Sequence, residues 1–335
     1  MRRQAILAIV FAAIFPLSFT NAQQARVTSG KKSSWIESVS YDPKGKPEEG
    51  EGASYYYLLM DEQENTLLQE DYYHYVYTIV TTEGIQEMAD FSVSYDPAYQ
   101  ALTFHEIKVM RGHSTIDQLS IKDISIIQRE ESMDRSLYDG SKTAIINLKD
   151  IRVGDIVEYS FTRKGYNPVH QNHIARTAYF DFYQSSDKYF RKLIVPATAN
   201  VTMKTLGEDV PEPVIKQAGN TTQYTWLIDK PKASQDDYYT PGWYNTSRIA
   251  MLSDFATWGD VGSWARELFA VSAADREKIR NEVAPSFRSV HDGDYLLEVI
   301  RFVQDEVRYL GFETGINSHK PHPPLQVYQQ RFGDC

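Results

Sequence analysis

The feature that most constrains this chain is an alternation of side-chain types with a period of two, which recurs between residues 53 and 230. In residues 73–80, the odd-numbered positions carry tyrosines and an isoleucine, so one face holds large side chains. In residues 156–162, Val157, Tyr159 and Phe161 alternate with polar residues. Because successive side chains of a strand point to opposite faces of a sheet, this period indicates half-buried β-strands.

Further candidate strands are separated by turn signals such as Asp96-Pro97 and Asp139-Gly140. They lie at residues 89–95, 102–110, 124–128, 144–148, 178–183, 191–195, 201–206 and 223–228. No helical stretch of matching length lies between them, which favours an antiparallel sandwich over a parallel α/β sheet. We therefore predict a mainly β protein with an antiparallel β-sandwich domain over residues 53–240.

The segment before this domain divides into two parts. Arg2 and Arg3 precede an apolar run over residues 5–19, and small residues ending at Ala22 follow it. This pattern predicts a secretory signal peptide over residues 1–22, and hence export to the periplasm, the cell envelope or the extracellular space. A retained anchor is the alternative, although the run is short for a span of ~20 residues. Residues 23–52 are polar and rich in turn formers, which predicts a linker or a loosely held arm.

Charge and cysteine content exclude several functions. The chain has 35 basic and 45 acidic residues, for a formal net charge of −10. Such a field repels phosphate, so we predict no nucleic-acid partner. Cys335 is the single cysteine, which excludes an intrachain disulfide and a cysteine-based metal cluster. We predict no cofactor and no bound metal.

The sequence period changes after residue 258. Short helices are predicted at residues 263–270 and 272–283, and the strongest helix at residues 294–310. Its apolar residues fall at spacings of four and three and form one stripe: Leu296, Ile300, Val303, Val307 and Leu310. Little sequence remains to cover this stripe, so we expect it to be exposed and the chain to stop inside its second domain.

The end of the chain resembles a known family. Residues 302–311 (Phe-Val-Gln-Asp-Glu-Val-Arg-Tyr-Leu-Gly) and 315–324 are similar to the segment before the nucleophile of transglutaminase-like domains. Gly333-Asp334-Cys335 resembles the Gly-Asp-Cys nucleophile motif of that family. Residues 148–161 and 243–264 resemble the module called domain of unknown function 3857, which commonly precedes such a domain in exported bacterial proteins. The resemblance implies that residues 241–335 form the N-terminal fragment of an α+β transglutaminase-like domain.

The resemblance also implies a papain-like thiol site. Its cysteine lies at the start of a buried helix and is activated by a histidine that an aspartate orients, an arrangement that lowers the pKa of a thiol. Cys335 would be this nucleophile, and the family's His and Asp lie downstream of it. The α-carboxylate of Cys335 itself disfavours the thiolate and raises its pKa. We therefore expect this polypeptide to be inactive; an inert terminal thiol is the alternative.

Two classes of function follow, and a third possibility is that the parent protein keeps the thiol-enzyme fold but has lost catalysis. In the first, the parent protein is an exported thiol enzyme that acts on amide bonds of a peptide or protein as a protease, amidase or transamidase. In the second, the sandwich is a non-catalytic binding or scaffold module of the cell envelope, with a protein or a glycan as partner. The sequence does not choose among these activities, and it fixes neither the substrate nor the oligomeric state.

Four other motifs are candidate sites. His170 with His173, and His319 with His322, have a spacing seen in metal sites, but neither pair brings an evident third ligand. The aromatic stretch that begins at Asp236-Asp237 is interpreted as a packed interdomain corner rather than a ligand platform. The tyrosine alternation in residues 73–77 is interpreted as sheet packing rather than a binding surface.

Overall fold

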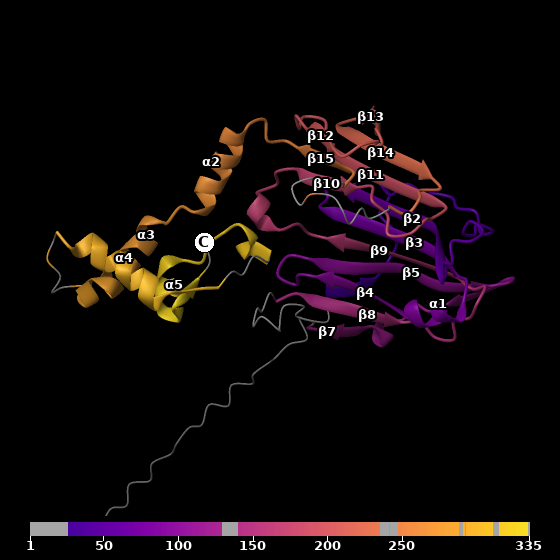
Figure 1. The fold of residues 1–335 in the computed structure, drawn as a ribbon, viewed down its shortest axis with the longest axis horizontal. Helices are drawn as coiled ribbons and strands as arrows, with labels where there is room; N and C mark the ends of the chain where they lie inside the picture. The colour runs from indigo at the N-terminus through magenta and orange to yellow at the C-terminus, as the bar shows by residue number, and fades with distance from the viewer. Residues whose placement is uncertain are drawn as a thin grey trace, which may run out of the picture.

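The structure is a computed structural model, and it describes residues 26–128, 140–234, 241, 247–287, 291, 293–310 and 315–333. Figure 1 shows a β part on one side and a group of helices, late in the chain, on the other. Strands account for most of the regular structure. The predicted mainly β class is therefore confirmed.

A nine-stranded sheet forms the body of the β part. Its order is β1 (Val27–Ser29), β5 (Ala101–Arg111), β9 (Ile156–Lys164), β3 (Glu70–Ile79), β2 (Tyr55–Asn65), β11 (Lys188–Pro196), β14 (Thr221–Asp229) and β13 (Val214–Ala218), and β6 (Ser114–Asp117) pairs with β5. Most neighbours are antiparallel, but β1 with β5 and β2 with β11 are parallel. The sequence did not reveal these parallel pairs, because the period of two is the same for either strand direction.

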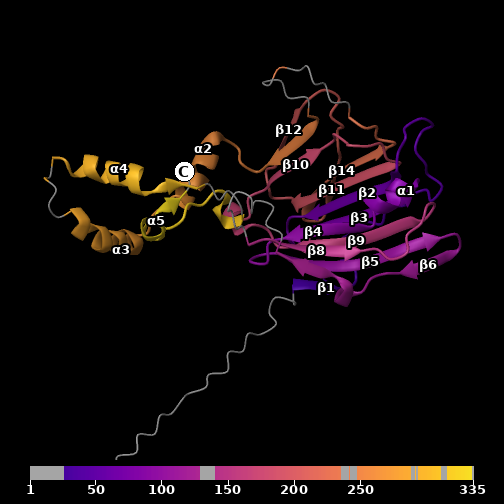
Figure 2. The same cartoon turned by 60° about the horizontal axis from the view of Figure 1, so that its bottom comes forward.

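Two small antiparallel sheets cover one face of the large sheet, which we call the inner face. One consists of β4 (Asp90–Tyr95), β8 (Lys142–Asn147) and β7 (Ser125–Ile127), and the other of β10 (Ala175–Tyr179), β15 (Ile249–Ser253) and β12 (Thr202–Leu206). Short elements between strands are α1 (Thr82–Glu87), η2 (Ile121–Asp123) and η4 (Pro168–His170). Figure 2 shows the layers from a second side.

Each small sheet closes its own hydrophobic core. Beneath β4-β8-β7, Phe104 and Ile107 of the large sheet pack in one cluster with Ile146. Beneath β10-β15-β12, Trp226 packs in a second cluster with Leu252. Burial of these apolar surfaces is the main force that joins the two layers. The sandwich predicted from the strand pattern is thus built from one long sheet and two short ones.

The β part continues beyond residue 240, where we placed its boundary. β15 pairs with β10 and with β12, so the sheet layer ends only at Ser253. The sequence of β15, Ile-Ala-Met-Leu-Ser, does not alternate apolar and polar residues, which is why the pattern did not identify it. Its residues Ile249, Ala250 and Leu252 are buried, as expected of a strand that lies between two others.

The segment predicted as a linker over residues 23–52 lies, in its described part, against the outer face of the large sheet. The Trp35 indole nitrogen donates to Glu70 at 2.6 Å, and Lys192 Nζ lies 2.8 Å from Glu37. Val39 and Tyr41 pack on a buried cluster around Leu58, Leu59 and Val76. Composition alone predicted a loose arm, because the contacts that hold this segment are mostly polar.

The helical part follows β15. It contains α2 (Trp258–Leu268), α3 (Ala273–Val283), η5 (Ala284–Phe287), α4 (Tyr295–Glu306), β16 (Arg308–Tyr309), η6 (Gly315–Ser318), α5 (Pro324–Gln330) and β17 (Phe332–Gly333). α2 begins with a capping box between Thr257 and Asp260. α4 stops at Glu306, short of the predicted end at residue 310, because Arg308 and Tyr309 pair with β17 instead.

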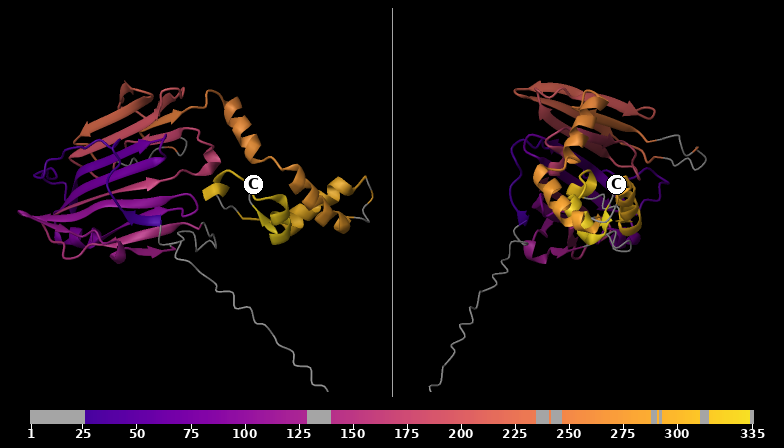
Figure 3. Two further views of the ribbon diagram at one scale, coloured as in Figure 1. Left: turned by 180° about the vertical axis from the view of Figure 1, so that it is seen from behind. Right: turned by 90° about the vertical axis from the view of Figure 1, so that its left-hand side faces the viewer.

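The apolar stripe of α4 is exposed, as the sequence predicts. Leu296 is 70% exposed, Ile300 44% and Val303 51%. Figure 3 shows α4 at the far end of the helical part, away from the β part. Within the described residues, no helix is long and apolar enough to cross a membrane. The predicted signal peptide, residues 1–22, lies outside the described ranges.

A matched pair of leucine substitutions tests this difference in packing. Leu102 is fully buried in the β part, whereas Leu296 is 70% exposed on α4. We expect Leu102→Ala to lower the free energy of unfolding by about 2–5 kcal/mol, through lost burial and a cavity. Leu296→Ala should change it by less than about 0.5 kcal/mol. Chemical denaturation followed by tryptophan fluorescence measures both, and equal losses would contradict the packing described.

Candidate functional site

A groove runs across the inner face between the two small sheets. It encloses about 680 Å³. Its floor is formed by the aromatic face of the central strands, and its walls by β4 and by the chain that follows β10. The floor includes Tyr55, Tyr57, Tyr73, Tyr75, Tyr159 and Tyr189. We call this cavity the inner groove.

The groove continues into a second cavity of about 310 Å³. The two cavities share Glu62, Tyr73, Arg163 and Arg191. The second one then reaches the loop at residues 166–170. Together they form an elongated site, with an aromatic half and a charged half.

An ion pair lies on the floor of the aromatic half. Arg191 Nη1 lies 2.7 Å from Glu62 Oε2, and the Tyr75 hydroxyl donates to Glu62 Oε1 at 3.2 Å. Arg191 also donates to the Thr177 carbonyl of β10 at 3.2 Å, which joins the floor to one wall. Burial raises the pKa of Tyr57 to about 12, so its hydroxyl remains protonated at neutral pH. The floor therefore offers ring faces, hydroxyl donors and one charge pair to a ligand.

The charged half contains two carboxyl groups that share one phenol. The Tyr166 hydroxyl lies 3.1 Å from Glu64 and 3.0 Å from Asp71. Arg163 pairs with Asp71 at 3.3 Å, and Arg176 pairs with Glu64. One hydroxyl proton satisfies only one carboxylate, and burial together with the charge of Glu64 raises the pKa of Asp71. This half can thus accept hydrogen bonds from a polar ligand and donate hydrogen bonds to it.

The charged half ends where the helical part contacts the β part. The Trp264 indole nitrogen of α2 donates to the Val169 carbonyl at 3.0 Å. The Asn167 side chain donates to the Gly315 carbonyl at 2.5 Å. The ring centroids of His170 and His319 are 5.6 Å apart. Burial, with the charge of His319 next, lowers the pKa of His170, so this ring tends to be neutral.

The histidine pairs singled out in the sequence are therefore separated and recombined. His170 meets His319 from the other pair, whereas His173 stacks on Phe255 at 4.1 Å. Among the described residues, no third ligand joins His170 and His319. These contacts are typical of a junction between two parts of a chain.

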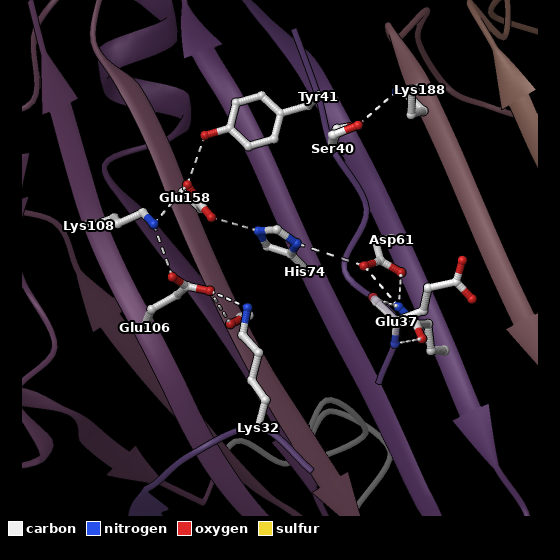
Figure 4. Close-up of polar contacts among 12 residues, drawn as sticks. Lys32, Glu37, Ser40, Tyr41, Asp61, His74, Glu106, Lys108, Glu158 and Lys188 are labelled. Atoms are coloured by element: carbon white, nitrogen blue, oxygen red, sulfur yellow. Dashed lines mark hydrogen bonds and ion pairs between the residues drawn. The ribbon is translucent and has the colours of Figure 1, made fainter. Parts of the chain in front are cut away.

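A different group of residues has the spacing of a metal site. His74, Glu106 and Glu158 on the outer face bring ligand atoms within 4.8 Å of one another. Two ammonium groups already neutralise these carboxylates, as Figure 4 shows. Lys108 Nζ lies 3.0 Å from Glu106 and 3.1 Å from Glu158, and Lys32 pairs with Glu106. With two cations in place, the group fits an ion-pair network rather than a metal.

His74 is the centre of this outer-face network. Its Nε2 lies 2.9 Å from Glu158, and its Nδ1 lies 3.8 Å from Asp61. Burial disfavours the charged imidazole, but the neighbouring carboxylates of Asp61 and Glu158 outweigh it and raise the pKa of His74. Tyr41 of the N-terminal arm donates to Glu158 at 2.9 Å. The network thus ties the arm to the sheet.

The remaining sequence candidates have different outcomes. Cys335 and the pair Asp236-Asp237 lie outside the described residues. The tyrosine alternation was interpreted as packing, which holds for Tyr77 but is incomplete, because Tyr73 and Tyr75 line the groove. The groove was not predicted from the sequence; the one signal for it is the recurrence of tyrosine at alternate positions of two strands.

Comparison with known proteins gives a family and a fold. A family model described as "Domain of Unknown Function with solved-structure structure (DUF3857)" matches residues 66–235. No curated protein matches the chain. A crystal structure described as a putative protease from Parabacteroides distasonis is similar, with a TM-score of 0.63 and 11% identity. The similarity covers 84% of this chain and 56% of that one, so the chain spans little more than half of its length.

A second solved structure is described as a putative nutrient binding protein from Legionella pneumophila. It has 6% identity and a TM-score of 0.25, and the match covers 59% of this chain and 67% of that one. A score this low does not indicate a shared fold.

The outer-face network predicts a pH-dependent stability. A raised pKa for His74 contributes stability below its unfolded value of about 6.5, and this contribution is lost as pH rises through the folded pKa. We expect His74→Gln to lower the free energy of unfolding by about 3 kcal/mol near pH 6, and by less near pH 9. The exposed His113→Gln is the control. A difference between wild type and His74→Gln that does not vary with pH would contradict a charged His74.

Proposed function

The chain belongs to the DUF3857 family, and we propose that it is part of an exported thiol enzyme whose β part binds peptide segments in the inner groove. The observation that supports this proposal most directly is the aromatic floor with its central Glu62–Arg191 pair. Aromatic rings offer large contact area, and their hydroxyls add hydrogen bonds. An elongated site of this kind suits an extended chain better than a compact small molecule.

Both charge signs in the groove also favour a peptide. Glu64 and Asp71 can accept ammonium groups, and Arg163 and Arg176 can donate to carboxylates. A neutral glycan would use the rings and leave most of these charges without new partners. A peptide presents amides and charged side chains of either sign, so it uses both halves of the groove.

We propose further that Cys335 is the nucleophile of a transglutaminase-like domain that begins in the helical part, and that residues 1–22 direct export. The Gly-Asp-Cys motif supports the first point, and the similar protein described as a putative protease is consistent with it. In such a site the thiolate attacks an amide carbonyl and forms a thioester, with release of the amine. The charged half of the groove ends beside the helical part, so the bound segment would lie near that domain.

The second candidate is a non-catalytic binding or scaffold module at the cell envelope. The inner groove supports it as well, because the residues that line the groove all belong to the β part and none to the helical part. In that case the groove would be the working part of the protein.

Peptide binding is tested at the groove rim. Tyr183 lines the groove and is fully exposed, so Tyr183→Ala removes contact area with little effect on folding. We expect immobilised chain to retain members of a random pool of capped peptides of about seven residues, with affinities about tenfold weaker in Tyr183→Ala. Tyr295→Ala on α4 should bind like wild type. Retention of neutral oligosaccharides but no peptides would refute the proposal.

The thiol proposal has a separate test in the full-length protein. Cys335→Ser should abolish release of a fluorescent amine from peptide amides, because the weaker hydroxyl nucleophile lacks a matched activating group. Peptide binding in the groove should be unchanged. Undiminished amide cleavage in Cys335→Ser would overturn the assignment of Cys335, and cleavage by neither protein would favour the scaffold module.

A further inference from the structure

One wall of the inner groove is an edge strand, β4, and the other is the chain that follows a second edge strand, β10. β4 pairs with β8 on one side, and β10 pairs with β15 on one side. Among the described strands, none pairs with the other edge of either one. Ser92, Val93 and Ser94 of β4 line the groove. The groove therefore runs along the unpaired main-chain edge of β4 as well as over aromatic side chains.

The pairing register shows which groups of β4 face the groove. The Ala89 carbonyl accepts from Leu148 N at 2.8 Å, so Ala89 and Leu148 belong to a hydrogen-bonded pair. In an antiparallel ladder such pairs alternate along the strand. Phe91 and Val93 therefore direct their N–H and C=O groups to β8, whereas Ser92 and Ser94 direct theirs to the open edge.

The open edge of β10 is less available than that of β4. The Thr177 carbonyl accepts from Arg191 at 3.2 Å, and the Ala175 carbonyl accepts from Arg176 at 3.1 Å. Both carbonyls lie on β10, so arginines already use part of that edge. Within the described ranges, no such contact reaches the backbone groups of Ser92 or Ser94. The open edge of β4 is thus more available to a partner strand than the open edge of β10.

β4 also lacks the usual protection of an edge strand. Natural edges are blunted by lysine, proline or a bulge, because unpaired N–H and C=O groups recruit other strands. The sequence of β4, Asp-Phe-Ser-Val-Ser-Tyr, has neither lysine nor proline, and its pairing with β8 has no register shift. Small serines at the open positions leave room for a neighbouring chain.

We propose that a peptide binds in the inner groove as an added strand on the open edge of β4. The inference rests on the proposed function and specifies how the ligand is recognised. An added strand lies about 4.8 Å from its neighbour, and its alternate side chains would face the tyrosine floor. Main-chain pairing gives affinity with little regard to sequence, and the floor selects large apolar side chains at every second position. The ligand class is therefore an extended polypeptide, not a glycan.

The test uses the tightest peptide retained from the capped pool, N-methylated at one backbone position at a time. Methylation at one parity removes N–H groups that pair with β4 and should weaken binding about tenfold or more, while the other parity should have little effect. Equal sensitivity at both parities would overturn the added strand while leaving peptide binding in the groove intact. Failure of the unmethylated pool to bind would instead overturn the proposed function and this inference with it.

A protein variant gives a second, independent readout. Ser92→Pro removes an open-edge N–H without touching the β4–β8 ladder, a position where edge strands tolerate proline. We expect it to weaken binding about tenfold, with Ser92→Ala as the matched control that binds like wild type. Peptide should also slow amide hydrogen exchange at Ser92 and Ser94 more than at Phe91 and Val93. Wild-type affinity in a folded Ser92→Pro variant, or uniform slowing along β4, would contradict the proposal.

Discussion

The structure depends on the incomplete cover of one continuous sheet. Two short sheets bury the ends of its inner face, in clusters centred on Phe104 and on Trp226. The strip between them remains open, and its tyrosines form the floor of the inner groove. If one wide sheet covered the inner face, as in a common sandwich, the same aromatic residues would be core and there would be no site. The site is therefore a consequence of how the second layer is divided.

The outer face differs from the inner face, because part of it is covered by a segment with few apolar residues. The N-terminal arm brings Trp35, Glu37 and Tyr41 to polar groups of the sheet. Buried charges are tolerated only when each has partners, and His74 between Asp61 and Glu158 meets this condition. The arm covers the part of the outer face around Leu58 and Val76, whereas the inner groove leaves part of the inner face exposed.

The groove and the helical part meet at one loop. Residues 166–170 line the charged half of the groove, and Trp264 and Gly315 contact the same loop from the helical part. In the proposed function, this shared loop would place a bound segment next to the domain that carries Cys335. The exposed stripe of α4 shows that the described helices leave apolar surface unburied. Peptide binding would then take place in the β part, and the thiol chemistry in the domain that carries Cys335.

The sequence by itself determined the strands and the helices with clear periods. The alternation in residues 73–80 became β3, and the stripe from Leu296 became the exposed face of α4. Local patterns predict local structure, because strand and helix periods are properties of consecutive residues. Only the tertiary structure decided which tyrosines pack and which line a groove, and which histidines meet. Tyr75 and Tyr77 are alike in sequence, but one lies beneath the gap between two sheets and the other beneath a sheet. That difference depends on β4 and β10, which are distant in the sequence.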